Sequence, residues 1–351
     1  MSHAVIDLRF FKTGVKKWIT RTDSSRYHCQ KCQHDFSSED RQPNPRRYGH
    51  SLMSWCAYFN AVCGANLSRT RRALGDLFEI FLDQSKIYLL KRYLTDSYKT
   101  LYEEVFQATV RDPILHVDET VVHLREGKIG YVWVLTSMDK VFYFYKPSRE
   151  TSFLTEMLTP FSGVLVSDFY TGYDALNCAQ QKCLVHLVRD IIQSVDRYGL
   201  RRRHLGKKHK RQVSRFLQSM ISKDFVSDLA DKYKKRFQKG GAKMFTFLDH
   251  DGVPWNNNNA EHAIKRFAKY RREGDGRFTE RTLKEYLVLA TVLETCEFNN
   301  VNVLKFLLSK ETTLVSLFKM AKRKDHAILH KPDRLPLLQA EIQSQNSEIF
   351  S

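Results

Sequence analysis

The spacing of apolar residues changes abruptly at Ile114, and this change constrains the fold more than any other feature of the sequence. Between residues 48 and 110, apolar residues recur at every third or fourth position, as they do on one face of a helix. From Ile114 onward, three consecutive runs rich in Val, Tyr, Phe and Trp cover 114–124, 130–138 and 140–148, with short turn sequences between them. The sequence therefore predicts a helical region followed by a three-stranded meander.

Later segments extend this pattern into an alternation of helices and strands. A helix is predicted at 148–158, and two further buried strands are predicted at 163–173 and 181–187. Three strands, a helix and then further strands are typical of a mixed α/β sheet. We expect an N-terminal segment, a helical region, an α/β core with a basic helical insertion near 189–245, and a tail, at 1–47, 48–110, 111–310 and 311–351.

The chain carries a large excess of positive charge. Its 351 residues include 57 Lys and Arg against 39 Asp and Glu, which gives a formal net charge of +18. This excess favours a nucleic-acid partner, because basic side chains gain affinity by displacing counterions from phosphates; a basic housekeeping protein is the alternative. The longest apolar stretch, near 286–293, is far shorter than the ~20 residues of a membrane span, and no secretory signal is visible. We expect a cytoplasmic protein without a membrane partner.

Two cysteines in the N-terminal segment have the spacing of a zinc knuckle. Cys29 and Cys32 are separated by two residues, which lets two thiolates reach one tetrahedral Zn²⁺ ion. A zinc ribbon needs a second pair of ligands, and the sequence has no second C-x2-C pair. The interpretations left open are a zinc site and half of a ribbon whose other ligands are missing.

Three acidic residues stand where predicted elements begin or end. Within the first run, Asp118 follows the apolar residues 114–117, where the strand is expected to end. Asp168 follows GVLVS at 163–167, the expected end of the fourth strand, and Glu261 opens an amphipathic helix. Acids in such apolar surroundings are costly unless they bind a cation or hydrogen-bond donors. Together they would form an oxygen cage for Mg²⁺ or Mn²⁺, and two such ions could serve the two oxygens of a phosphodiester exchange. The alternative is three separate caps and turn formers.

Four motifs together resemble a known family. They are HVDET at 116–120, SDFYTGYDAL at 167–176, CLVH at 183–186 and WNNNNAEHAIKRF at 255–267. In this order they resemble the insertion-sequence transposases of the IS66 family, a branch of the DDE transposases with an RNase H-like catalytic core. The resemblance extends from the C-x2-C segment to about residue 310, although the family usually has two cysteine knuckles.

The resemblance carries expectations about chemistry and partners. It implies that Asp118, Asp168 and Glu261 are the catalytic carboxylates and bind divalent cations. It also implies metal-dependent hydrolysis at the element ends, followed by attack of the freed 3′-OH on target DNA. The implied partners are double-stranded DNA at the ends and the target, further copies of the chain, and accessory proteins of the element, in the bacterial nucleoid.

Cys183 and His186 resemble a C-x2-H element of several DDE transposases. The sequence predicts that both residues lie in the strand after Asp168. A metal-binding role and a structural role, as a buried thiol and a hydrogen-bonded imidazole, are both left open.

Basic residues in two regions are candidates for contacts with DNA. The resemblance implies a helix-turn-helix region before the core, and an ordinary helical bundle with solvated charges is the alternative. In the helical region the candidates are Arg69, Arg71, Arg72, Lys86, Lys91 and Arg92. In the basic insertion, contacts with the DNA backbone alone are expected from Arg201, Arg202, Arg203, Lys207 and Lys208.

The residues before Glu261 suggest two further roles. Asn258 and Asn259 are candidate caps of the helix that carries Glu261, because asparagine side chains accept from the first free N–H groups of a helix. Trp255 is a candidate for stacking on a base at the cleaved DNA end. Two alternatives to a transposase stay open: an inert DNA-binding descendant and a structure-specific nuclease with an RNase H-like core.

Overall fold

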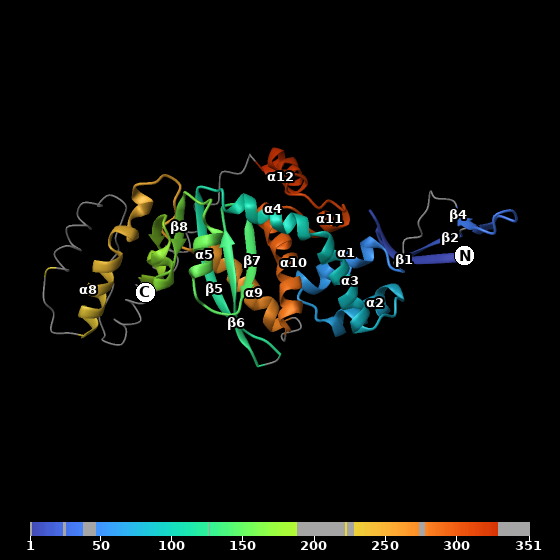
Figure 1. The fold of residues 1–351 in the computed structure, drawn as a ribbon, viewed down its shortest axis with the longest axis horizontal. Coiled ribbons are helices and arrows are strands. Elements are labelled where there is room, and N and C mark those ends of the chain that lie inside the picture. The colour runs from blue at the N-terminus through green and yellow to red at the C-terminus, as the bar shows by residue number, and fades with distance from the viewer. Residues whose placement is uncertain are drawn as a thin grey trace, which may run out of the picture.

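A five-stranded mixed sheet forms the centre of the protein, with helices packed on it (Figure 1). The computed structural model describes residues 2–23, 26–37, 47–125, 127–187, 222, 228–273 and 278–328. The strand order is β7-β6-β5-β8-β9; the first three strands form an antiparallel meander, and β8 and β9 run parallel to β5. The strands are β5 (Ile114–His123), β6 (Ile129–Thr136), β7 (Val141–Lys146), β8 (Val164–Ser167) and β9 (Ala179–Lys182). The predicted mixed α/β sheet is confirmed.

The side chains of β5 point alternately into two buried layers, one on each face of the sheet. Leu115 and Val117 pack into the larger core cluster, whereas Val122 belongs to a second cluster on the other face of the sheet. Successive side chains of a strand point to opposite faces, so the even-numbered residues of β5 face the second cluster. That face is covered by α9 (Asn258–Glu273), whose Ala260 and Ala263 let the helix approach the strands closely.

The predicted helical region forms four helices. They are α1 (His50–Ala61), α2 (Leu67–Phe78), α3 (Gln84–Ser97) and α4 (Lys99–Thr109). Helix α2 begins where the Asn66 side chain accepts from the N–H of Arg69 at 2.9 Å, as a helix cap does. The prediction of helices between 48 and 110 is therefore correct.

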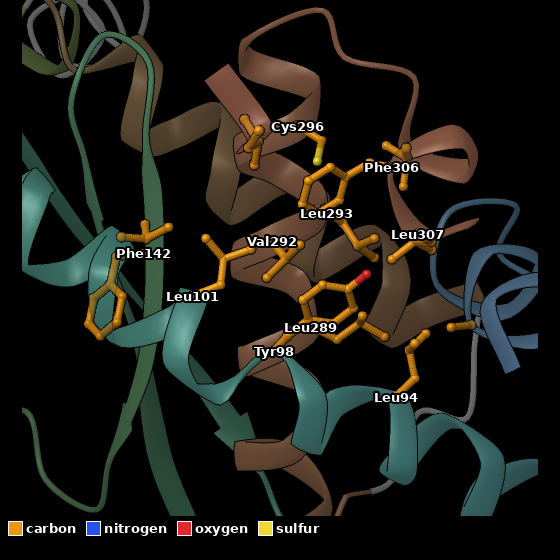
Figure 2. Packing of buried hydrophobic residues seen from close by; sticks show 14 of the residues in the cluster. Leu94, Tyr98, Leu101, Phe142, Leu289, Val292, Leu293, Cys296, Phe306 and Leu307 are labelled. Atoms are coloured by element: carbon orange, nitrogen blue, oxygen red, sulfur yellow. The ribbon is translucent and has the colours of Figure 1, made fainter. Parts of the chain in front are cut away.

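The helical region and the sheet share one core. Figure 2 shows Tyr98 and Leu101, at the junction of α3 and α4, pointing toward Leu289 and Val292 of α10 (Glu280–Phe298). All four side chains are buried in the larger cluster, and Phe142 of β7 joins them. Burying one such side chain is worth about 1.5–3 kcal/mol, so this shared core holds the helices against the sheet.

Helix α10 also covers the free edge of the sheet. The hydroxyl of Thr291 accepts from the N–H of Tyr143 at 3.0 Å, and that of Thr295 accepts from the N–H of Val141 at 3.2 Å. The free N–H groups of an edge strand can pair with a strand of another chain. Here the two threonine hydroxyl groups accept hydrogen bonds from these N–H groups within the protein. Beyond α10 follow α11 (Val303–Leu308) and α12 (Leu314–Ile328).

The N-terminal segment is more regular than its sequence suggests. It forms a long hairpin of β1 (Ser2–Phe11) and β2 (Gly14–Asp23), then a short one of β3 (Arg26–His28) and β4 (Asp35–Ser37). The carboxylate of Asp7 accepts from the N–H of Leu52 at 2.7 Å and joins the first hairpin to α1. The hairpins lie at one end of the elongated molecule, and α8 (Asp228–Gly240) lies at the other (Figure 1).

The remaining described elements are short. They are α5 (Ser152–Met157), η1 (Thr171–Ala175), η3 (Ala242–Met244) and η4 (Thr246–Leu248). Within the described ranges, none of the helices is both long enough and apolar enough to cross a membrane.

Candidate active site

The first two acids lie beside each other on adjacent strands. Asp168 directly follows the last residue of β8, as predicted. Asp118 does not end its strand: β5 continues to His123, because beyond Asp118 it goes on pairing with β6. The parallel register of β5 and β8 matches His116 with Val166, and two residues further it places Asp118 beside Asp168 on the same face.

Glu261 lies over the same face of the sheet. It lies in the first turn of α9, the helix that packs on the even-numbered side of β5, and is 9% exposed. Its Oε2 atom is 3.4 Å from the ammonium group of Lys265, one helical turn later. Its Oε1 atom is buried and has no hydrogen-bond partner among the described residues.

The electrostatics of Asp118 indicate that the three carboxylates interact. Burial is the largest cause of a raised pKa for Asp118, which reaches about 7. The negative charges of Glu119, Asp168 and Glu261 add to the rise, whereas the N–H of Glu119, which donates to Asp118 Oδ1 at 2.9 Å, opposes it. A divalent cation with oxygen ligands fits this arrangement, because it would satisfy the unpartnered oxygen of Glu261 and cancel the repulsion.

Cys183 and His186 lie beside Glu261 but not in a strand, which corrects the sequence prediction. Strand β9 ends at Lys182, and residues 184–187 form a helical turn. The chain leaves the sheet because the N–H of Leu184 donates to the carbonyl of Trp255 at 3.0 Å. As a result, His186 Nδ1 lies 3.6 Å from Glu261 Oε1.

Asn257 ties the start of α9 to β5, although it was not predicted as a site residue. Its buried side chain donates to the carbonyl of Val117 at 2.9 Å and meets the ring Nδ1 of His116 at 3.1 Å. Its backbone N–H donates to the Cys183 sulfur at 3.2 Å. Burial lowers the pKa of His116 to about 4, so this imidazole is neutral around pH 7.

The predicted caps Asn258 and Asn259 do not precede α9 but lie within it. The side chain of Asn256 accepts from the N–H of Asn258 at 3.1 Å, whereas Asn258 and Asn259 are the first two residues of the helix itself. The Asn259 amide instead donates to the carbonyl of Ser137 at 3.3 Å. Trp255 is 44% exposed and is therefore not a core residue.

Glu119 follows Asp118 in the chain but lies on the opposite face of the sheet. It accepts from Arg149 Nε at 2.7 Å and from the hydroxyl of Tyr173. The Arg149 guanidinium also lies 4.0 Å from the ring centre of Tyr170, whose N–H donates to Asp168 Oδ1 at 2.9 Å. These residues were missed by sequence reasoning, although strand alternation alone separates Glu119 from Asp118.

The candidate DNA-binding residues fall into three groups. Four are exposed on α2 and α3: Arg69, Arg71, Arg72 and Lys86. Lys91 and Arg92 make contacts within the protein, Lys91 with Asn60 and Arg92 with Glu285 at 3.4 Å. Those of the basic insertion lie outside the described residues: Arg201, Arg202, Arg203, Lys207 and Lys208.

Cys29 and Cys32 lie in the tight turn between β3 and β4. The N–H of Gln33 donates to the carbonyl of Cys29 at 2.8 Å, and Gln33 has a φ of +57°. Hydrogen bonds from Cys32 and from the backbone of Lys31 lower the pKa of the Cys29 thiol, as suits a metal ligand. In the part of the chain that the structure describes, no third metal-ligating side chain completes this pair.

Of three comparisons with known proteins, one places the chain in a family. Residues 46–223, about half of the sequence, match the family model described as "Transposase IS66 family". No match was found among curated proteins. Among solved structures, the chain aligns with the "Crystal structure of the Mos1 Strand Transfer Complex" at 11% identity, over 68% of this chain and 82% of that one. The TM-score of 0.16 is too low to support any argument.

Proposed function

Because the chain belongs to the IS66 family of transposases, we propose that it cleaves the ends of its element and joins them to target DNA. The observation that carries this proposal is the convergence of Asp118, Asp168 and Glu261 on one face of the sheet, where the pKa of Asp118 is raised to about 7. Three neighbouring carboxylates without an equal number of cationic partners repel one another and destabilise the fold. A site whose function requires bound metal ions explains why the protein keeps them.

We infer that the α/β core is RNase H-like. The order of the five strands supports this, with the first acid on the central strand β5 and the second directly after its parallel neighbour β8. Both acids thus stand on backbone that is held by neighbouring strands, and such rigid support keeps reacting groups in place. Glu261 is held by α9, which Asn257 fastens to β5.

The three carboxylates would hold divalent cations, Mg²⁺ or Mn²⁺, and two ions fit the chemistry. Bound there, the ions would activate the attacking oxygen and stabilise the charge on the leaving oxygen of the phosphodiester. The residues of the chain would position the ions against the scissile phosphate, first for water and then for the 3′-OH. The raised pKa of Asp118 means that its carboxyl group must lose its proton before it can serve as a ligand.

Two basic regions of the chain would hold the DNA. We propose that α2 and α3 act as a helix-turn-helix-like reader through the exposed Arg69, Arg71 and Arg72. The basic insertion would contribute backbone contacts, in keeping with a net charge of +18. The exposed ring of Trp255, just before the helix of Glu261, would stack on a base at the cleaved end.

The test uses the purified full chain, DNA that carries the ends of its own element with flanking sequence, and Mg²⁺ or Mn²⁺. Nicks at the element ends together with strand-transfer joints are the expected products. Nicks without joints would replace the proposal with a nuclease, and binding without nicks would replace it with an inert DNA-binding protein. Omitting the metal must abolish both products, since no step is expected without it.

A further inference from the structure

A cysteine, a histidine and a glutamate converge beside the catalytic acids. Cys183 follows β9, His186 lies in the next helical turn, and Glu261 lies in the first turn of α9. One ligand atom from each lies within 4.8 Å of the other two. We propose that these three side chains form a binding site for a thiophilic transition metal of the Zn²⁺ class, distinct in its ligand set from the all-carboxylate site.

The site contains polar atoms that the protein leaves unsatisfied. Both His186 Nδ1 and Glu261 Oε1 are buried, and neither has a hydrogen-bond partner among the described residues, although they lie only 3.6 Å apart. A buried polar atom without a partner costs about 1–3 kcal/mol, so two such atoms that face each other call for a ligand between them. A cation that accepts one nitrogen and one oxygen ligand meets this need.

The geometry matches zinc rather than magnesium. With bonds of about 2.0–2.3 Å, tetrahedral Zn²⁺ keeps its N, O and S ligands about 3.3–3.6 Å apart. The separation of 3.6 Å between His186 Nδ1 and Glu261 Oε1 already fits, and the sulfur needs to approach by roughly an ångström. A thiolate and an imidazole select zinc-like metals, whereas Mg²⁺ requires oxygen ligands.

Burial raises the pKa of the Cys183 thiol, and a backbone hydrogen bond to its sulfur opposes this rise. The backbone N–H of Asn257 donates to the Cys183 sulfur at 3.2 Å, and such bonds orient a ligand and stabilise its negative charge. Asn257 is itself fixed by its side-chain bond to Val117 of β5. The His186 side chain is 27% exposed, which gives an ion a path into the site. Three protein ligands leave the fourth position of the metal open.

Glu261 belongs to both ligand sets, and this has a consequence that rests on the proposed function. A zinc ion bound to Cys183 and His186 would hold the Glu261 carboxylate away from Asp118 and Asp168. Zinc should therefore inhibit cleavage that depends on Mg²⁺, and the enzyme would be active only where free zinc is scarce.

The test measures Co²⁺ binding by the full chain without DNA, so its outcome is independent of whether the protein cleaves DNA. Because Cys29 and Cys32 could bind the same metal, the measurement uses a background with Cys29→Ser and Cys32→Ser. We expect one Co²⁺ per chain with a thiolate-to-cobalt charge-transfer band in the near ultraviolet, displaced by Zn²⁺. The band should vanish in Cys183→Ser and persist in the matched control Cys178→Ser.

A second variant guards against misfolding of Cys183→Ser, whose sulfur is buried. His186→Gln alters a partly exposed side chain, so it should keep the wild-type melting temperature and bind Co²⁺ at least tenfold more weakly. The proposal is overturned if a folded background protein shows no band, or if the band survives unchanged in both variants. Cleavage assays of the same proteins then ask whether His186→Gln is less sensitive to Zn²⁺.

Discussion

Asp118 and Glu119 are neighbours in one strand, yet their side chains lie on opposite faces of the sheet and in opposite electrostatic surroundings. Glu119 is buried with its charge satisfied by Arg149 and the hydroxyl of Tyr173. Asp118 is half-buried among other carboxylates, and the pKa of its side chain is raised to about 7. The difference teaches that burial of an acidic side chain does not by itself indicate a functional site. Burial without a compensating positive charge or hydrogen-bond donor does indicate one.

The largest contrast is expected in catalysis. Asp118→Asn should lower the rate of DNA cleavage by on the order of 10³-fold, because losing one metal ligand removes several kcal/mol of transition-state stabilisation. Its melting temperature should not fall, since the substitution also removes repulsion from Asp168 and Glu261. The cleavage rate and the melting temperature of the same preparation check these two expectations. A variant that cleaves at the wild-type rate would show that Asp118 is misassigned.

The opposite result is expected one residue later. Glu119→Ala should destabilise the fold by about 2 kcal/mol, because it leaves the Tyr173 hydroxyl buried without its partner and releases Arg149. The exposed Glu150→Ala is the matched control and should change stability by less than about 0.5 kcal/mol. Denaturant unfolding measures the difference. Equal stabilities of the two variants would mean that the Glu119 cluster does not hold the fold together.

A third acid, Glu294, tests whether a raised pKa alone marks a catalytic residue. Burial raises the pKa of Glu294 in α10 to about 7, although Arg266 lies 3.9 Å away and opposes the rise. The folded state therefore keeps a proton that the unfolded chain loses near pH 4.5, and stability falls as the pH rises from about 4.5 to 7.

Glu294→Gln removes this titration. The variant should be as stable as the wild type near pH 4, and more stable at pH 8 by on the order of 3 kcal/mol. Cleavage should be unchanged, since Glu294 faces Arg266 of α9 and not the three acids proposed to be catalytic. Urea unfolding at the two pH values checks the prediction, and a constant difference between the proteins would refute the assigned protonation.

The smallest contrast concerns the approach to α9. Trp255→Ala should lower cleavage or joining about tenfold, the value of one lost stacking contact, with little change in melting temperature because the ring is exposed. Asn256→Ala removes the side-chain bond to the N–H of Asn258 and should cost about 0.5–1 kcal/mol of stability. Melting temperature and cleavage rate are compared for both variants. A large loss of stability in Trp255→Ala would make the tryptophan structural.

Much of the core could be predicted because local signals and tertiary structure agree there. Alternating Val, Tyr and Phe residues gave three strands at nearly the observed positions, and the change of period at Ile114 marked the start of β5. The position of Asp168 after β8 and of Glu261 in the first turn of α9 also followed from local pattern.

The errors arose where pairing across the chain decides the outcome. The strand-like run at 114–124 matches β5, but Asp118 lies inside the strand and not at its end, because β5 goes on pairing with β6 as far as His123. Cys183 leaves the sheet because the next N–H, that of Leu184, bonds to the carbonyl of Trp255, 71 residues later. The partners of Glu119 likewise come from 30 and 54 residues further along the chain.

The central claim is that Asp118 binds the catalytic metal while Glu119 does not. The direct measurement compares cleavage by Asp118→Cys and Glu119→Cys in Mg²⁺ and in Mn²⁺, because Mn²⁺ accepts a sulfur ligand far better than Mg²⁺. We predict that Asp118→Cys is inactive with Mg²⁺ and regains cleavage with Mn²⁺, whereas Glu119→Cys keeps the wild-type ratio of the two rates. Mg²⁺-dependent cleavage by Asp118→Cys at the wild-type rate would contradict the account.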